Sequence, residues 1–171
     1  MTKPLLIFGS ARSDGGTKTA VDMVTSRQAV EFIDLAEQNI GAYDYQNRNQ
    51  SDDFIKIAEK MTKTQVIIFA TPVYWYAMSG SLKTFFDRFT DLITVRKDLG
   101  RALKGQKCYM ICAGASEHMP EGFEYPFKAT CDYLKMEYKG GFYFHTGKNE
   151  KLVQEAKETA KSFSATIFSQ S

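Results

Sequence analysis

Short apolar runs alternate with amphipathic segments along the chain, and this alternation restricts the fold more than any other feature of the sequence. The runs that resemble strands lie at residues 4–9, 29–35, 65–70, 106–113 and 137–145. The segments with helical spacing lie at residues 17–27, from 51 onwards, around 82–89, at 121–134 and at 150–168. A regular alternation of strands and helices predicts a parallel sheet with helices on both faces.

Local sequence signals support that architecture. The first run, residues 4–9, is continuously apolar, as expected of a strand that is buried on both faces of a sheet. Thr17 is the expected N-cap of the first helix, and Pro126 is tolerable in an early turn of the fourth. Five such strands predict one flavodoxin-like α/β domain over residues 1–171, with strand order 2-1-3-4-5. Ligands of such sheets bind at the carboxyl ends of the strands, so the loops there are the places to search.

The composition excludes several classes of protein. The chain has 171 residues with 22 Lys and Arg against 20 Asp and Glu, and its net charge of +2 does not suit a nucleic-acid-binding domain. The apolar runs are too short for a membrane span or a signal-peptide core, so neither is expected. Cys108, Cys112 and Cys131 have no framework spacing and predict reduced, buried thiols in a cytoplasmic protein.

The loop after the first predicted strand, residues 9–17, has the features of an anion site. It leads into a helix N-terminus, where unpaired amides and the helix dipole attract negative charge. The loop adds hydroxyl groups, a guanidinium and two glycines, at Ser10, Ser13, Thr17, Arg12, Gly15 and Gly16. Walker A and dinucleotide fingerprints both fail, because position 14 is Asp and position 11 is Ala. The loop therefore predicts a cradle for one phosphate group, with a turn that binds nothing as the alternative.

The loop after the third predicted strand carries three consecutive aromatic residues, Tyr74, Trp75 and Tyr76. Aromatic rings at the exposed end of a strand are suited to flank a planar ligand, and Pro72 favours an extended turn before them. Consecutive side chains cannot all face one way, so one or two would contact the ligand. The alternative is that the rings fill a local core or a subunit interface.

The loop after the fourth predicted strand combines small residues around Gly114 with Glu117 and His118. Small residues allow backbone amides to approach a ligand closely, and Glu117 and His118 are candidates for contact with a substrate. A lone histidine is more often structural or solvated, and His145 is a weaker candidate still. Neither histidine has metal-like spacing to other ligands, so no metal site is predicted.

The segments FGSARSDGGT and ATPVYWYAMSGSLKTFFDRF together resemble the NAD(P)H-dependent FMN reductase family of flavodoxin-like proteins, closest to the branch of iron–sulfur flavoproteins. The first keeps the family pattern Gly-Ser-x-Arg-x-x-Gly-x-Thr but has Gly16 where Asn is usual, which removes one hydrogen bond to the phosphate. The second keeps Pro-Val-Tyr-Trp followed by Gly-x-Leu-Lys-x-x-x-Asp-Arg. Residues 41–48, where that branch places its cluster cysteines, contain no Cys. We therefore expect FMN without an iron–sulfur cluster.

The resemblance also implies roles for individual residues. The expected FMN-binding residues are Ser10, Arg12, Ser13, Gly15, Gly16 and Thr17 around the phosphate, with Pro72, Val73, Tyr74, Trp75 and Gly114 around the isoalloxazine. Tyr76 and His118 are the expected substrate contacts. Lys83, Asp87 and Arg88 are expected to be structural or to lie at a dimer interface.

The implied activity is a ping-pong oxidoreductase reaction. NAD(P)H gives a hydride to flavin N5 and leaves, and a small electrophile such as a quinone, flavin, azo or nitro compound then takes the electrons. The flavin carries this chemistry, so no catalytic side chain is predicted. Homodimers or homotetramers are common in the family. A flavodoxin-type electron carrier and a non-catalytic flavin-binding module are the alternatives, although carriers are usually strongly acidic and this chain is not.

Overall fold

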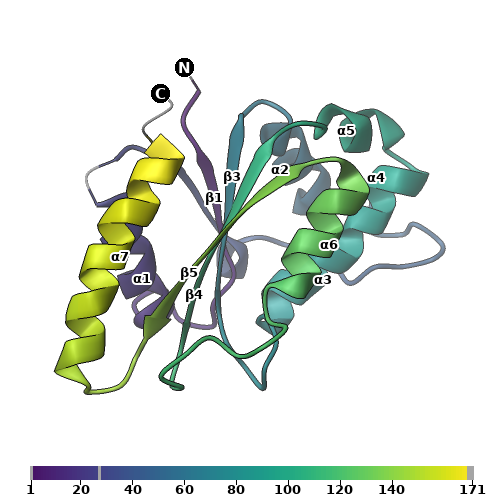
Figure 1. Cartoon of the computed structure of the whole chain (residues 1–171). Helices are drawn as coiled ribbons and strands as arrows, with labels where there is room; N and C mark the ends of the chain where they lie inside the picture. The colour runs from purple at the N-terminus through teal and green to yellow at the C-terminus, as the bar shows by residue number, and fades with distance from the viewer. Residues whose placement is uncertain (1, 27, 169–171) are drawn as a thin grey trace.

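The strands form one parallel sheet, as the alternation predicts. The computed structural model describes residues 2–26 and 28–168. Its five strands are β1 (Leu5–Phe8), β2 (Glu31–Asp34), β3 (Val66–Pro72), β4 (Lys107–Gly114) and β5 (Glu137–His145). They lie in the order β2-β1-β3-β4-β5, and every neighbouring pair is parallel (Figure 1). The flavodoxin-like fold is therefore confirmed.

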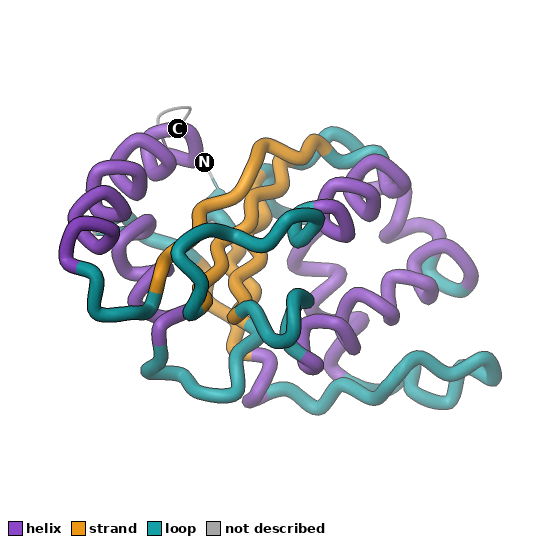
Figure 2. The backbone as a smooth tube through the Cα atoms, turned by 60° about the horizontal axis from the view of Figure 1, so that its bottom comes forward, coloured by secondary structure: helices purple, strands orange, loops and turns teal. Residues whose placement is uncertain are grey.

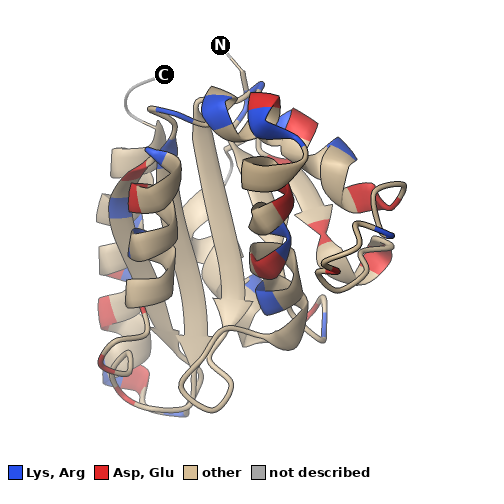
Figure 3. Cartoon of the chain, turned by 90° about the vertical axis from the view of Figure 1, so that its right-hand side faces the viewer, with Lys and Arg blue, Asp and Glu red and all other residues tan. Residues whose placement is uncertain are grey.

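Helices cover both faces of this sheet. The helices are α1 (Gly16–Thr25), α2 (Asp53–Met61), α3 (Gly80–Asp87), α4 (Asp91–Thr94), α5 (Lys97–Ala102), α6 (Tyr125–Leu134) and α7 (Glu150–Phe168). Helices α1 and α7 lie on one face and the others on the opposite face (Figure 1). The central strands β1 and β3 carry no charged residue, and charges gather on the helices and loops (Figure 3).

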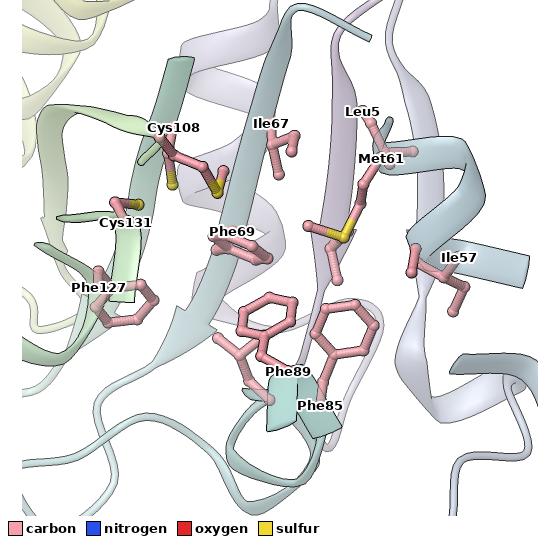
Figure 4. Packing of buried hydrophobic residues seen from close by; sticks show 14 of the residues in the cluster. Leu5, Ile57, Met61, Ile67, Phe69, Phe85, Phe89, Cys108, Phe127 and Cys131 are labelled. Carbon is pink, nitrogen blue, oxygen red and sulfur yellow. The ribbon is translucent and has the colours of Figure 1, made fainter. Parts of the chain in front are cut away.

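Alternate residues of the strands supply two separate cores. In β1, Leu5 and Ile7 join the core under α2, α3 and α6, whereas Leu6 and Phe8 join the core under α1 and α7. All four are at most 1% exposed, as expected of a strand that is buried on both faces. The first core is the larger one, and part of it is shown in Figure 4.

More aromatic residues lie in that larger core than in the other one. Phe69 of β3 packs edge-on against Phe86 of α3, with ring centroids 4.9 Å apart, and Phe86 packs against Phe127 of α6 at 5.3 Å. Phe85 and Phe89 add a further edge-on pair at 5.4 Å (Figure 4). Such geometry stabilises a core beyond the area that it buries. These rings therefore join the sheet to its helices and do not face a ligand.

Two predicted helix starts are wrong, for local reasons. Thr17 is not the N-cap of α1: the helix begins at Gly16, and the N-cap is Gly15, whose backbone is extended. The Thr17 side chain is buried, and no side chain caps the helix. Helix α6 begins at Tyr125 and not at residue 121, because Gly122 has a φ of 78° and residues 121–124 form turns. Pro126 lies in the first turn of α6, as predicted. The predicted end of the first helix at residue 27 lies outside the described residues, and the described helix ends at Thr25.

Arg88 follows the end of α3 and is 1% exposed. Its guanidinium pairs with Asp52 and, at 2.8 Å, with Asp91. It also donates hydrogen bonds of 3.0 Å each to the carbonyls of Gly41 and Asn49. Arg88 is therefore structural: it fixes the long loop between β2 and α2 to the end of α3.

The cysteines lie inside the protein, as predicted. Cys108, Cys112 and Cys131 are free and buried. Burial raises the pKa of Cys108 and of Cys112 above the usual thiol range, so both thiols are neutral and unreactive at physiological pH. Among the described residues, no helix has both the length and the apolar character that a membrane crossing requires.

Candidate functional site

A cavity of about 270 Å³ opens at the carboxyl ends of β1, β3, β4 and β5. This edge of the sheet is at the bottom of Figure 1 and faces the viewer in Figure 2, where loops surround the strand ends. The predicted residues that line the cavity are Ser10, Arg12, Gly15, Gly16, Thr17, Pro72, Val73, Tyr74 and Gly114. Loops far apart in the sequence thus meet at one site because the strands that carry them are parallel neighbours.

The N-terminus of α1 points its unpaired amides at one end of the cavity. No side chain caps this helix, and its first turn contains no acidic residue. Gly16 and Thr17, the first two residues of the helix, both line the cavity. Ser10 is 6% exposed, and its Oγ accepts a hydrogen bond of 3.4 Å from the Arg12 amide. This end of the cavity therefore favours an anion.

Arg12 brings a full positive charge to the same end. Its side chain is exposed, and none of the ion pairs formed among the described residues includes it. A guanidinium with no protein carboxylate beside it is available to an anionic ligand, and its planar fork suits the oxygens of a phosphate.

Two glycines are required by the close packing around the cavity. A Cβ at Gly16 would collide with Cγ2 of Thr146. A Cβ at Gly114 would lie 2.9 Å from the Tyr143 hydroxyl oxygen and 3.2 Å from the Val73 Cβ. Any side chain at either position would therefore push the walls of the cavity apart.

Strand β5 holds the loop after β4 in place. The Tyr143 hydroxyl donates a hydrogen bond of 2.6 Å to the Ser116 carbonyl, and Nδ1 of His145 lies 2.9 Å from the same oxygen. The Thr146 amide donates to the Gly114 carbonyl at 2.9 Å. Burial raises the pKa of Tyr143, which keeps its hydroxyl protonated and able to donate. These bonds fix the backbone that forms this side of the cavity.

The aromatic loop after β3 contributes only part of its length to the cavity. Val73 donates its amide to the Ala113 carbonyl at 2.8 Å, which keeps residues 72–74 beside β4. Tyr74 lines the cavity and is 47% exposed. Trp75 and Tyr76 are not part of this lining and are 94% and 75% exposed.

Four other predicted residues are not part of the cavity lining. They are Ser13, Trp75, Tyr76 and His118, all exposed, and their roles remain predictions. Sequence reasoning missed Thr146, and it named Gly114 without its neighbours Ala113 and Ala115. The signal for Thr146 was its place just after a fifth parallel strand, whose carboxyl end must reach the same edge.

Two other hollows on the surface share no lining residue with this cavity. They measure about 410 Å³ each and lie between helices α3–α5 and α6. Neither is lined by a residue of the loop after β1 or of the loop after β4. Within residues 2–26 and 28–168, no three His, Cys, Asp or Glu side chains converge in a way that would hold a metal ion.

The fold and the anion end of the cavity define a flavodoxin-like protein, and comparison with known proteins is consistent with that class. A model of the NADPH-dependent FMN reductase family matches residues 2–151. The chain is 27% identical over 148 residues to YwqN of Bacillus subtilis (strain 168), whose name describes an NAD(P)H-dependent FMN-containing oxidoreductase. The matched region covers 81% of this chain and 82% of YwqN. The chain belongs to the NADPH-dependent FMN reductase family, a family of oxidoreductases.

Solved structures share the fold. The Trp repressor binding protein from Bacillus subtilis superposes with a TM-score of 0.75 at 24% identity, covering 94% of this chain and 97% of its own. An FMN-dependent NADH-azoreductase from Bacillus anthracis, solved in complex with FMN, gives a TM-score of 0.73 at 11% identity. The superposition covers 97% of this chain and 99% of the azoreductase. At these identities the likeness supports the architecture alone.

Proposed function

We propose that the cavity at the strand ends binds FMN and that the protein oxidises NAD(P)H with a small electrophilic acceptor. The observation that carries this proposal is the uncapped N-terminus of α1 beside the unpaired Arg12. A helix N-terminus and a free guanidinium at the end of a parallel sheet form a site for a phosphate group. Membership in the FMN reductase family supplies the identity of the phosphate-bearing ligand.

The residues at the anion end fit an FMN phosphate. The amides of Gly16 and Thr17, the hydroxyls of Ser10 and Thr17 and the fork of Arg12 would hold it. Ser13 lies in the same loop and is exposed. Gly16 leaves room for Thr146 to pack against the helix start, and that packing shapes the phosphate cradle.

The opposite end of the cavity fits the ring system. Pro72, Val73, Tyr74 and Gly114 would line the isoalloxazine, with backbone groups facing its polar edge. When bound, FMN supplies a ring that takes a hydride from NAD(P)H and, in a ping-pong sequence, gives two electrons to a quinone, flavin, azo or nitro compound. The lining contains no carboxylate, histidine or lysine. The chain therefore binds and orients the reactants, and a proton needed by the acceptor comes from water.

The proposal extends to the oligomeric state, the cellular location and the cofactor content of the protein. We propose a homodimer or homotetramer in the cytoplasm that binds neither nucleic acid nor membrane. We also propose that it carries no iron–sulfur cluster, because a cubane cluster usually needs four thiolates. The chain has three cysteines, and all three are buried in the core.

Arg12→Ala tests the phosphate assignment. A hydrogen bond from a charged donor contributes about 1.5–3 kcal/mol, so we expect the dissociation constant for FMN to rise about 10- to 100-fold. The measurement is titration of flavin fluorescence with the FMN-free protein. Arg101→Ala, at an exposed arginine outside the cavity, is the matched control and should retain wild-type affinity. Stoichiometric, tightly held FMN in the Arg12→Ala variant would show that the phosphate binds elsewhere.

A further inference from the structure

One of the two hollows between the helices has a strongly basic lining. It measures about 410 Å³ and lies between α4, α5 and the end of α6. Helix α5 and the C-terminal end of α6 are at the top of Figure 1, at the end of the sheet opposite the proposed FMN cavity. The lining contains no carboxylate and four cations, Lys97, Arg101, Lys104 and Lys135, and we call this site the basic hollow.

The four cations have no charged partner in the protein. None of the ion pairs formed within residues 2–26 and 28–168 includes any of them. Asp98, next to Lys97 in the sequence, already pairs with Arg96 at 2.9 Å, and Asp132 is exposed outside the lining. Four like charges around one hollow repel one another, and a bound anion would relieve that repulsion.

The adjacent hollow, between α3 and α6, lacks this imbalance. It shares Ile93, Tyr133 and Leu134 with the basic hollow, and its only charged lining residues are Lys83 and Asp87. Those two side chains pair with each other at 2.5 Å. The unpaired charge is therefore a property of the basic hollow and not of this whole face of the protein.

Helix stability explains only part of this arrangement. Arg101 lies in the last turn of α5 and Lys104 lies just after it, where the helix dipole favours cations. Lys97, in contrast, is the first residue of α5, where a cation is disfavoured. Lys135 has a φ of 60° at the end of α6, a position that glycine usually occupies. Two of the four cations thus lie where they lower folding stability, as expected of side chains that serve binding.

The backbone around the basic hollow is held in place. The Gly105 amide donates a hydrogen bond of 2.8 Å to the Lys135 carbonyl, which joins the turn after α5 to the end of α6. Gly100 packs so closely against α4 that a Cβ there would collide with the Leu92 carbonyl oxygen. Leu92 and Leu134, both buried, add apolar lining. The fold therefore gathers the four cations around one concave surface.

The size and lining of the basic hollow suit a small organic polyanion. Its volume is typical of small-molecule sites, and a net charge of +2 disfavours a nucleic acid, which binds to an extended basic surface. The ring of Tyr133 also lines the hollow, is 67% exposed and can stack on a flat base. Several cations for phosphate groups beside a ring for a base match a nucleoside polyphosphate.

We propose that the basic hollow binds a nucleoside polyphosphate, with its phosphates on the four cations and its base on the ring of Tyr133. This site shares no lining residue with the proposed FMN cavity. The inference therefore does not depend on the proposed function, and either can fail without the other.

ATP without Mg²⁺ is the probe, added to the FMN-saturated protein in a calorimetric titration at about 150 mM salt. We expect one site per chain with a dissociation constant below about 1 mM. Tripolyphosphate, which lacks the base, should bind about tenfold more weakly. Absence of saturable ATP binding would overturn the proposal. Equal affinity for tripolyphosphate would also overturn it, because the hollow would then be a cluster of cations that takes any polyanion.

Arg12→Ala shows which site the ATP occupies. This variant should bind ATP as tightly as the wild type does, because Arg12 lines the other cavity. A loss of ATP binding in Arg12→Ala would place ATP at the strand ends and overturn the proposal. The comparison holds even if the protein proves to bind no FMN.

The double variant Lys104→Glu with Lys135→Glu tests the phosphate contacts. Reversal of two charges in the basic hollow should weaken ATP binding about 100-fold or more. Lys157→Glu with Lys161→Glu makes the same change in net charge at exposed lysines of α7 and should leave ATP affinity within about twofold. Equal losses in the two double variants would show that ATP responds to net charge alone.

Lys97→Glu separates binding from folding. An acidic residue in the first turn of α5 suits the helix dipole, so Tm without ATP should rise by about 1 °C. The dissociation constant for ATP should nevertheless rise about tenfold. A fall in Tm together with the loss of binding would mean that Lys97 is structural, and an unchanged ATP affinity would contradict its assignment.

Tyr133→Ala tests the stacked base. The dissociation constant for ATP should rise about tenfold, and Tyr133→Phe, which keeps the ring, should restore the wild-type value. Tyr125→Ala is the matched control, because Tyr125 belongs to the same helix, is 71% exposed and does not line the basic hollow. An equal loss in the Tyr125 variant, or no loss in Tyr133→Ala, would contradict the contact with the base.

Discussion

Arg12 and Arg88 carry the same guanidinium group in opposite surroundings. Arg12 is exposed, lines the cavity and forms none of the ion pairs among the described residues. Arg88 is 1% exposed, pairs with Asp52 and Asp91, and donates to two backbone carbonyls. One arginine has its charge available to a ligand, and the other has its charge fully used by the protein.

The difference shows that the charge of Arg88 stabilises the fold, whereas the charge of Arg12 is available for ligand binding. Burial opposes the charge of Arg88, but hydrogen bonds to Asp52 and Asp91 outweigh that effect and raise its pKa above the ordinary value. A buried charge of this kind is tolerated only while all its partners are present. The cavity edge instead keeps an unpaired cation beside an uncapped helix, which helps folding little and is suited to bind an anion.

Arg88→Met should cause the largest loss of stability. It leaves the carboxylates of Asp52 and Asp91 buried without their cation, so the free energy of unfolding should fall by about 3–5 kcal/mol. Urea denaturation followed by circular dichroism measures the change. Arg101→Met removes an exposed arginine and should change little. A loss below about 1 kcal/mol in the Arg88 variant would remove the contrast between the two arginines.

The buried thiols of Cys108 and Cys112 should make the stability of the protein depend on pH. Burial raises the pKa of Cys108 and Cys112 in the folded protein, so stability is fully present below the unfolded thiol pKa and is lost as pH rises above it. Above about pH 8.5 each of these thiols should lower the free energy of unfolding by about 1.4 kcal/mol per pH unit. Urea denaturation at pH 8, 9 and 10 measures this slope. Cys112→Ala should make the slope shallower, and an unchanged slope would show that the buried thiol does not contribute.

Gly16→Ala tests the packing at the cavity edge. The added methyl group would meet Cγ2 of Thr146, so the free energy of unfolding should fall by about 1–2 kcal/mol and FMN affinity should also fall. Gly80→Ala is a closely matched control, because Gly80 is also the first residue of a helix and a Cβ there would meet no atom within 4 Å. If both variants behaved alike in denaturation and FMN titration, the close approach of Thr146 would not matter.

Arg12→Ala should have the smallest effect on stability. Measured without FMN, its free energy of unfolding should stay within about 0.5 kcal/mol of the wild-type value, because Arg12 has no ion-pair partner to lose. With saturating FMN the variant should be less stable than the wild type, because weaker binding gives less stabilisation. Thermal unfolding with and without FMN makes both comparisons. A large loss without FMN would mean that Arg12 is structural, like Arg88.

The sequence predicts the sheet well for a physical reason. Strands such as β1 and β3 are buried on both faces, so they appear as continuous apolar runs. The short helices α4 and α5 were missed because they have four and six residues, too few for a periodic pattern. Tertiary contacts hold them: Arg88 pairs with Asp91 at the start of α4, and Gly100 of α5 packs closely against the Leu92 backbone of α4.

The site was predictable where a loop has its own chemistry. The glycines, hydroxyls and arginine of residues 9–17 predict an anion site from the sequence alone, and five of these residues line the cavity. The positive φ angles of Trp75 and Tyr76, 48° and 64°, were not predictable, because neither residue type favours the left-handed region. Thr146 was missed because its contribution depends on how closely Gly16 approaches it.

The absorbance spectrum of the purified protein, followed by anaerobic addition of NADPH or NADH, tests the proposed FMN oxidoreductase most directly. We expect a bound flavin spectrum in about equimolar amount, which bleaches when either nucleotide is added and returns when a quinone follows. A protein that contains no flavin and binds none when FMN is added would contradict the proposed function. A bound flavin that neither nucleotide bleaches would leave the FMN site standing but would contradict the proposed oxidoreductase.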